Sequence, residues 1–326
     1  MRPPAQRAIS RRALAWLVPA SPALAQPAGR PWRVGSLHLA PWTAPHHIGF
    51  REGLRLLGLE DGRQVTLDPA GHGLRREQFA AHARALVAQG VDAIHTSGDA
   101  GIEAARQATP SIPILAMTDD LVRAGFAASY ARPGGNVTGV SLLAAELDEK
   151  RQEVLAELLP GARRIAALGD ALLMTPGRAA ALEAGATLRG LTLDLRLVRT
   201  PEEIGPAITA LHGAGAEGLN LLATPLLFNN RAIIYERVAA LRLPAVYQWP
   251  DMAREGGLAA YGPNMVGLYR ERMAPMLLRL LRGASPATLP IEQPIRFELV
   301  LNRRTAETLG LDLPLPLLSR AEDVIE

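Results

Sequence analysis

Short apolar runs alternate with longer amphipathic stretches from Trp32 onward. The runs are bounded by polar and turn residues and have the length of buried strands, which we expect at 34–39, 65–67, 93–96 and 114–117. The stretches between them predict helices over 46–57, 75–89 and 99–108. In the second of these, Phe79, Ala83, Leu86 and Val87 fall on one helical face. This alternation predicts βαβ units around a parallel sheet.

The same order of elements starts again after a turn cluster, Arg-Pro-Gly-Gly-Asn, at residues 132–136. The expected strands are 137–141, 164–168, 193–198, 218–223 and 245–247, and the expected helices are 145–159, 177–189, 201–214 and 229–241. No residue-level repeat relates the two halves. About 300 residues also exceed what a single hydrophobic core usually organises, so two α/β lobes are expected.

The alternation ends after Tyr261-Gly262-Pro263, where a long helix over 264–282 and a strand over 295–301 are predicted. These elements could return the chain to the first lobe and then to the second. We therefore expect one Rossmann-like lobe from 31–144 plus about 262–288. The other lobe is expected from 145–261 plus about 289–326. Several crossings between lobes would form a hinge.

The first 25 residues have the pattern of a secretory signal. They hold four arginines and no acid, followed by an apolar run at 13–20 and Ala23-Leu24-Ala25. A buried first helix is disfavoured because Pro19 and Pro22 would interrupt it. Arg11-Arg12 resembles a twin-arginine signal, and a general secretory signal fits equally well. The pattern predicts export to the periplasm.

Export changes how the charge of the chain is interpreted. The full chain has 35 basic and 32 acidic residues, and removal of four arginines leaves 31 against 32, a net charge of −1. This balance gives no support to nucleic-acid binding. The chain has no cysteine, and hence no disulfide and no lipid-bearing cysteine. We expect a protein free in the periplasm, as a monomer.

Motifs of cofactor binding and catalysis are not found in the sequence. It contains no G-x-G-x-x-G after the first strand, no G-x-x-x-x-G-K-[ST] and no G-x-S-x-G. Seven histidines are scattered without metal-binding spacing, and the adjacent His46 and His47 would diverge by about 100° on a helix. The sequence therefore predicts neither a cofactor nor a metal, and an enzyme is disfavoured.

Candidate ligand contacts come from the loops at the carboxyl ends of the strands, because parallel sheets bind ligands there. The candidates are Trp42, Ser97, Gly98, Asp99, Thr118, Asp119, Asp120, Thr224, Gln248, Trp249 and Tyr261. Amides at the start of helix 99–108 could hold an anionic group, although Asp99 would repel it.

Two subsets of these residues have clear alternative roles. Asp119 or Asp120 could meet an ammonium group, or could equally cap a turn. On the first alternative, Asp120→Ala should weaken binding of a cationic or zwitterionic ligand by more than tenfold, about 1.4 kcal/mol. The aromatic residues Trp42, Trp249 and Tyr261 could cover an apolar part of the ligand, or could equally pack in the core.

Several segments resemble the tryptophan/tyrosine-type ABC transporter substrate-binding family. Residues 131–140 read Ala-Arg-Pro-Gly-Gly-Asn-Val-Thr-Gly-Val, and further matches are 157–162, 243–247, 261–263, 297–302 and 320–326. The resemblance implies a type I periplasmic-binding-protein fold, two lobes with three crossings, and delivery of a small ligand to an ABC permease. Some members bind aromatic amino acids. The chain departs from the family pattern at Asp99, at Leu121 and in loop 169–175, which lacks the usual Asn-Pro.

Three classes of function remain from the sequence. The leading hypothesis is a transport receptor whose lobes close on an amino-acid-like solute. A sensory module that signals to a membrane kinase is the alternative, and gene neighbourhood would separate the two. An enzyme of the same fold is disfavoured, because no credible nucleophile–base pair is found.

Overall fold

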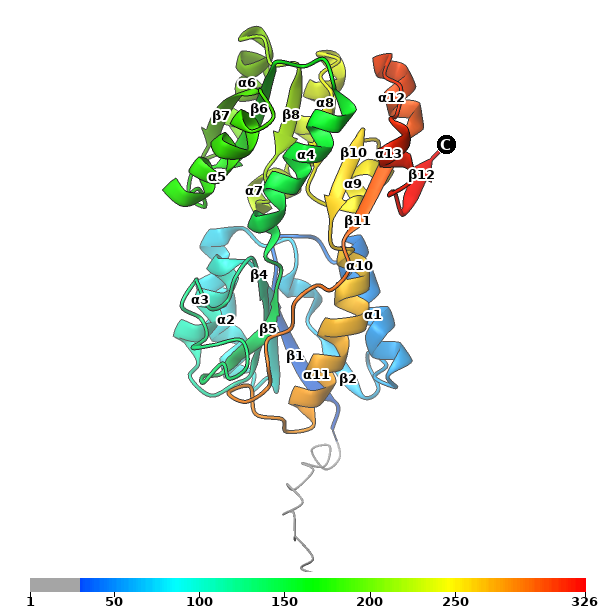
Figure 1. Cartoon of the computed structure of the whole chain (residues 1–326). Helices are drawn as coiled ribbons and strands as arrows, with labels where there is room; N and C mark the ends of the chain where they lie inside the picture. The colour runs from blue at the N-terminus through cyan, green and yellow to red at the C-terminus, as the bar shows by residue number, and fades with distance from the viewer. Residues whose placement is uncertain (1–29) are drawn as a thin grey trace, which may run out of the picture.

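Two α/β lobes stack end to end in the computed structural model, which describes residues 30–326 (Figure 1). Each lobe has its own sheet with helices on both faces. The predicted signal peptide, residues 1–25, lies outside the described residues. Among those described, no helix is both long and apolar enough to cross a membrane.

The first lobe contains a five-stranded parallel sheet in the order β2-β1-β3-β4-β5. Its strands are β1 Trp32–Leu37, β2 Val65–Leu67, β3 Ala93–Ser97, β4 Ile114–Thr118 and β5 Val137–Ser141. The helices are α1 Pro45–Leu56, α2 Phe79–Ala88 and α3 Asp99–Ala108, with the short 3₁₀ turns η1 Pro69–Gly71 and η2 Arg76–Gln78. Helices α2 and α3 cover one face and α1 the other (Figure 1). Apolar residues such as Leu37, Ile94 and Ile114 fill the layers between them.

The second lobe contains a seven-stranded sheet in the order β12-β11-β10-β9-β8-β6-β7. Its strands are β6 Arg164–Asp170, β7 Thr192–Val198, β8 Gly218–Leu221, β9 Ala245–Tyr247, β10 Ala259–Gly262, β11 Glu298–Asn302 and β12 Asp323–Ile325. Strand β11 runs antiparallel to β10, and the other pairs are parallel. The helical elements are η3 Ala144–Leu147, α4 Asp148–Leu158, α5 Pro176–Thr187, α6 Pro201–Gly213, α7 Pro225–Asn229, α8 Arg231–Ala240, α9 Pro250–Arg254, α12 Arg303–Leu309 and α13 Leu315–Leu318.

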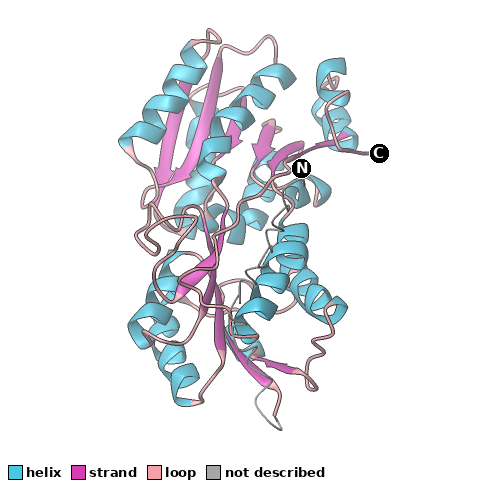
Figure 2. Ribbon diagram, turned by 60° about the horizontal axis from the view of Figure 1, so that its bottom comes forward, coloured by secondary structure: helices cyan, strands magenta, loops and turns pink. Residues whose placement is uncertain are grey.

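Three segments connect the lobes (Figure 2). The first leads from β5 to α4. The second leads from β10 to a helical stretch made of α10 Met265–Leu268, the π-helical turn η4 Tyr269–Met273 and α11 Ala274–Leu281, which packs on α1. The third leads into β11. The Ser141 N–H donates to the Glu292 carbonyl oxygen at 2.9 Å, so the first lobe holds the chain through Glu292, a few residues beyond the expected return at about 289.

Most predicted elements occur near their expected bounds. Strands 65–67, 137–141 and 245–247 and helix 99–108 match in full. The predicted helix 75–89 begins with the 3₁₀ turn η2, helix 229–241 is divided at Asn230, and strand 295–301 begins only at Glu298. Strands β10 and β12 and helices α9 and α12 were not predicted, because runs this short are defined by their pairing and packing partners.

Candidate functional site

A cavity of about 200 Å³ lies between the two lobes. Its walls come from the carboxyl ends of β3 and β4 in the first lobe and of β6 and β8 in the second, with further residues from α1, α7 and η4. The volume is below the roughly 300–1,000 Å³ of pockets that accept drug-sized ligands. The cavity therefore suits a small solute that touches both lobes.

Seven of the predicted contact residues line this cavity: Ser97, Gly98, Asp99, Thr118, Asp119, Thr224 and Trp249. They come together because the parallel strands of each sheet end at the edge that faces the other lobe. The Thr118 hydroxyl donates to Asp99 Oδ1, which ties the ends of β4 and β3 together. Gly98 precedes α3 with φ of 77°, a conformation that side chains with a Cβ rarely adopt.

Two of the predicted aromatic residues lie away from the cavity lining. Trp42 packs beneath the Arg51 guanidinium, which lies 4.1 Å from the ring centre, and its ring edge meets His72. Tyr261 is in β10, where its ring contacts Phe297. Both rings serve packing in this structure, which is the alternative that the sequence left open.

Two of the predicted polar residues also have structural partners instead of a place on the cavity wall. Asp120 Oδ1 accepts the N–H groups of Val122 and Arg123 at 2.9 and 3.0 Å, so it caps the turn that follows β4. Gln248 is fully buried, and its Oε1 accepts the Thr224 N–H at 3.2 Å. Gln248 therefore positions a loop of the cavity from behind.

Sequence reasoning missed seven polar and aromatic residues of the cavity wall: His46, Arg76, Phe79, Asp170, Phe228, Asn229 and Tyr269. The signal for Asp170 was present, because loop 169–175 follows a predicted strand. Phe228 lies on α7 just after Thr224 and Pro225. Tyr269 lies on the predicted helix 264–282, which was expected to return to the first lobe, but the sequence does not show which face of that helix meets the cavity.

Aromatic rings form a continuous wall that spans both lobes. The ring centres of Tyr269 and His46 are 4.9 Å apart, those of His46 and Phe228 are 6.3 Å apart, and those of Phe228 and Trp249 are 6.4 Å apart. His46 and Tyr269 belong to the first lobe, and Phe228 and Trp249 belong to the second. Burial lowers the pKa of His46 to about 3, with neighbouring positive charge as the next cause, so this ring is neutral near pH 7. The wall offers flat apolar surface.

Carboxylates outnumber fixed cations among the lining residues. Asp99, Asp119 and Asp170 are the acids, and Arg76 supplies the permanent positive charge. Asp170 is buried, and its Oδ1 accepts the Leu172 N–H at 2.9 Å. Asp119 is paired with Arg123. The arrangement favours a ligand that carries a positive group.

Backbone N–H groups at the start of α3 bring positive partial charge to the cavity, in contrast to the carboxylates. Gly98 is the capping residue, and Asp99 and Ala100 form the first turn along the cavity. The first N–H groups of a helix have no partner within the helix, and the helix dipole adds partial positive charge there. A ligand carboxylate could therefore be held at the same cavity that offers acids for an ammonium group.

A profile of the family described as ABC transporter substrate binding protein matches residues 43–325. The chain belongs to this family. It is 24% identical over 269 residues to a tyrosine-binding protein of Clostridioides difficile (strain R20291), which covers 81% of this chain and 76% of that protein. Proteins of this family bind substrates for ABC transporters.

Solved structures show the same fold as this substrate-binding protein. The ABC domain in complex with L-Trp from Streptococcus pneumonia aligns with a TM-score of 0.80 at 23% identity, over 91% of this chain and all of that one. The ligand-free, open structure of a substrate-binding protein with adhesive properties from Clostridium difficile aligns with a TM-score of 0.63 at 21% identity, over 90% and 99% of the two chains. The predicted type I periplasmic-binding fold is confirmed.

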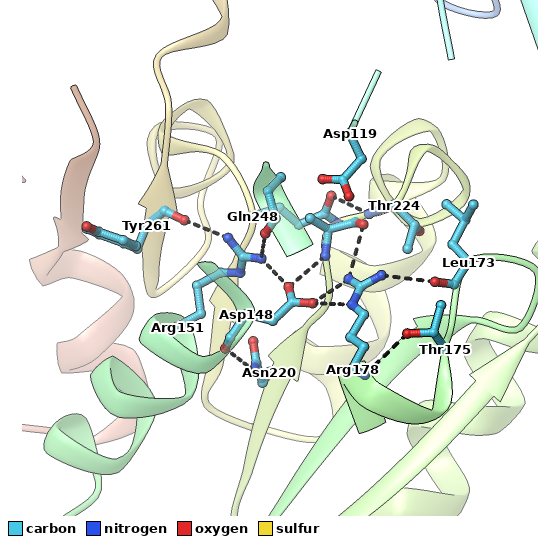
Figure 3. A network of polar contacts seen from close by, with 12 residues as sticks. Asp119, Asp148, Arg151, Leu173, Thr175, Arg178, Asn220, Thr224, Gln248 and Tyr261 are labelled. Atoms are coloured by element: carbon cyan, nitrogen blue, oxygen red, sulfur yellow. Dashed lines mark hydrogen bonds and ion pairs between the residues drawn. The ribbon is translucent and has the colours of Figure 1, made fainter. Parts of the chain in front are cut away.

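A buried ion network holds the hinge of this substrate-binding protein (Figure 3). Asp148 lies between the guanidinium groups of Arg151 and Arg178 and forms an ion pair with each. Asp148 and Arg151 are 1% and 0% exposed. Arg151 also donates to the carbonyl oxygens of Ala144 and Tyr261, which lie at the first and second crossings. The network therefore fixes the second lobe to two of the three connections.

The same network shapes the second-lobe wall of the cavity. Arg178 donates to the carbonyl oxygens of Leu173 and Ala223, and the Ala223 N–H donates to Asp148 Oδ1 at 3.1 Å. Leu173 and Ala223 both line the cavity. Desolvation on burial lowers the pKa of Arg151, and the Asp148 carboxylate opposes this effect.

Proposed function

We propose that this protein is an exported receptor that captures a small amino-acid-like solute, with preference for an aromatic side chain, and delivers it to an ABC permease. Membership in the substrate-binding family supports the transport role. Residues 1–25 supply the features of a secretory signal and support export to the periplasm. The permease is the expected protein partner.

The observation that carries the ligand class is the combination of groups in one cavity. An aromatic wall from His46 to Trp249 lies beside carboxylates, and the free amides of α3 lie at the same cavity. The first feature suits a ring, the second an ammonium group and the third a carboxylate. The named ligands of two relatives, tyrosine and L-Trp, belong to the same class.

Capture follows from the position of the cavity between the lobes. A solute that contacts Asp119 and Ser97 on one side and Thr224 and Phe228 on the other binds the closed form more tightly than the open form. The three crossings act as the hinge for this closure. The closed shape would then be the form that a permease selects.

Titration calorimetry tests this proposal on the chain from residue 26 onward. The panel comprises aromatic amino acids, aliphatic amino acids, tyramine as an amine without carboxylate, and phenylpropionate as a carboxylate without amine. We expect saturable binding of an aromatic amino acid and loss of at least tenfold for each truncated analogue, about 1.4 kcal/mol apiece. Absence of binding for all the amino acids, or binding of the truncated analogues as tight as that of the aromatic amino acids, would contradict the proposed ligand class.

A further inference from the structure

Five of the seven histidines of the chain gather in the first lobe. They come from separate elements: His38 follows β1, His46 and His47 begin α1, His72 follows η1, and His95 lies in β3. His38, His46, His47 and His95 are buried and His72 is half-buried. Spacing along the sequence gave no sign of this cluster, because the fold brings these elements together.

Three of these rings converge closely enough to share an ion. One nitrogen from each of His38, His47 and His72 lies within 4.8 Å of the others. The Nδ1 atoms of His47 and His72 are 3.1 Å apart. A tetrahedral zinc ion with Zn–N bonds of about 2.0–2.1 Å holds its nitrogen ligands about 3.4 Å apart. Small rotations of the rings therefore suffice to reach ligand geometry.

Hydrogen bonding among neutral rings leaves this cluster incompletely satisfied. His47 Nδ1 lies 2.9 Å from the Pro41 carbonyl oxygen as well as 3.1 Å from His72 Nδ1. A neutral imidazole has one N–H and a carbonyl oxygen can only accept, so His47 Nδ1 carries the proton and donates to Pro41, which leaves the lone pair of His47 Nε2 for an ion. Among residues 30–326, the buried atoms His47 Nε2 and His95 Nε2 also have no hydrogen-bond partner. Converging lone pairs are a feature of cation sites.

A small cavity adjoins the rings. It has a volume of about 10 Å³ and is lined by His47, His72 and His95 together with Trp42 and Arg51. This is close to the space that one water-sized sphere occupies. The space holds one atom-sized group beside His47 and His72, and His38, which does not line it, would reach that group by rotation of its ring.

The backbone holds the three ligand candidates in fixed positions. The His38 N–H donates to the Gly71 carbonyl oxygen at 2.8 Å, and the Leu74 N–H donates to the His38 carbonyl oxygen at 3.0 Å. A Cβ on Gly71 would lie 2.0 Å from the Ser36 carbonyl oxygen, so η1 packs directly on β1. Rigid elements of this kind preorganise a metal site.

A contact with Ser97, outside the three proposed ligands, orients the His38 ring. His38 Nδ1 lies 2.9 Å from Ser97 Oγ, and His38 Nε2 lies 3.2 Å from His95 Nδ1, a contact that a bound ion would replace. Ser97 also lines the inter-lobe cavity and hydrogen-bonds to Tyr269. Ligating histidines usually bond their second nitrogen to such a partner. The Ser97 contact thus connects the histidine cluster to the solute cavity.

The chemistry of the three candidate ligands indicates which metal ions could bind. Imidazole ligates a metal ion in its neutral form, and all three candidate ligands are imidazoles. The three candidate ligands include no carboxylate, which disfavours Ca²⁺ and Mg²⁺. Imidazole ligands suit zinc, copper and nickel. The nearby Arg51 favours an anion, such as chloride or hydroxide, as the fourth ligand.

We propose that His38, His47 and His72 form a binding site for a late first-row divalent metal ion, with Zn²⁺ as the first candidate, inside the first lobe. The site is distinct from the inter-lobe cavity and does not depend on the nature of the solute. It contradicts the expectation from sequence spacing that the chain has no metal site.

Metal uptake by the untagged, chelator-treated protein tests this proposal. After equilibrium dialysis against Zn²⁺, we expect one ion per chain by elemental analysis. Loading with Co²⁺ should give the visible absorption bands of a tetrahedral site, and Zn²⁺ should abolish them by displacement. Absence of stoichiometric uptake in the wild-type protein would overturn the proposal, whatever the variants show.

Variants locate the ion. His72→Gln and His47→Gln should each weaken Zn²⁺ association at least tenfold, whereas His212→Gln, at an exposed position of α6, should bind as the wild type does. Far-UV circular dichroism and titration of the solute check that each variant is folded. Uptake that persists in folded His72→Gln and His47→Gln, or that disappears in His212→Gln, would place the ion elsewhere and refute the assignment.

Discussion

Neutralising Asp148 should destabilise the second lobe more than any surface charge of the same helix. Asp148→Asn keeps the size of the side chain but removes the charge that pairs with the buried Arg151 and the half-buried Arg178. Removing one partner of a buried ion pair costs about 3–5 kcal/mol. Each kcal/mol lowers the melting temperature by about 2–4 °C in a unit of 150–250 residues. The expected decrease is therefore about 6–20 °C.

The matched control is Glu157→Gln, also in α4. Glu157 pairs with Arg320 at the surface, where the side chains are 36% and 45% exposed. Such a pair contributes under about 1 kcal/mol. Both variants are compared with the wild type by differential scanning calorimetry and by urea denaturation at neutral pH. Equal unfolding free energies for Asp148→Asn and Glu157→Gln would refute the view that the buried network stabilises the hinge.

Three further changes probe the cavity and the first lobe. Asp170→Asn should weaken binding of a zwitterionic amino acid about tenfold or more. Asp120→Asn, in a turn outside the cavity, should leave the calorimetric affinity nearly unchanged. The reverse order of effects would contradict the placement of both carboxylates. Phe228→Ala should reduce affinity for aromatic solutes about tenfold more than for aliphatic ones, and a uniform loss would argue against ring stacking. Gly53→Ala would place a Cβ 2.5 Å from the Arg270 carbonyl oxygen. It should therefore lower the free energy of unfolding, measured in urea, by about 1–3 kcal/mol. An unchanged urea midpoint would show that α1 can shift.

Local sequence was enough to place some of the polar candidate residues at the cavity and not others. Ser97, Gly98 and Asp99 were predicted because the end of a strand and the start of a helix fix their place in a parallel sheet. Asp119 and Asp120 occupy the same loop, yet Asp119 lines the cavity and Asp120 caps the turn. Adjacent side chains of a loop leave the backbone in different directions, and the sequence does not reveal which of them meets the cavity.

The aromatic candidate residues differ in whether they reach the cavity, for another reason. Trp249 lines the cavity, whereas Trp42 and Tyr261 pack against Arg51 and Phe297. An aromatic side chain buries apolar area equally well in a core or in a cleft. Which of these it does depends on neighbours that are distant in the chain.

By itself, the sequence determined the tandem α/β order, the edge of each sheet where ligand-contacting loops gather, and the family. The first two features follow from local periodicity and turn chemistry, which act over a few residues, and the family follows from the resemblance of segments such as residues 131–140. The tertiary structure alone decided that Tyr269 lines the inter-lobe cavity, that Arg178 joins Asp148 at the hinge, and that His38, His47 and His72 converge. Each of these depends on contacts between segments far apart in the chain, because packing of whole elements sets them and local preference does not.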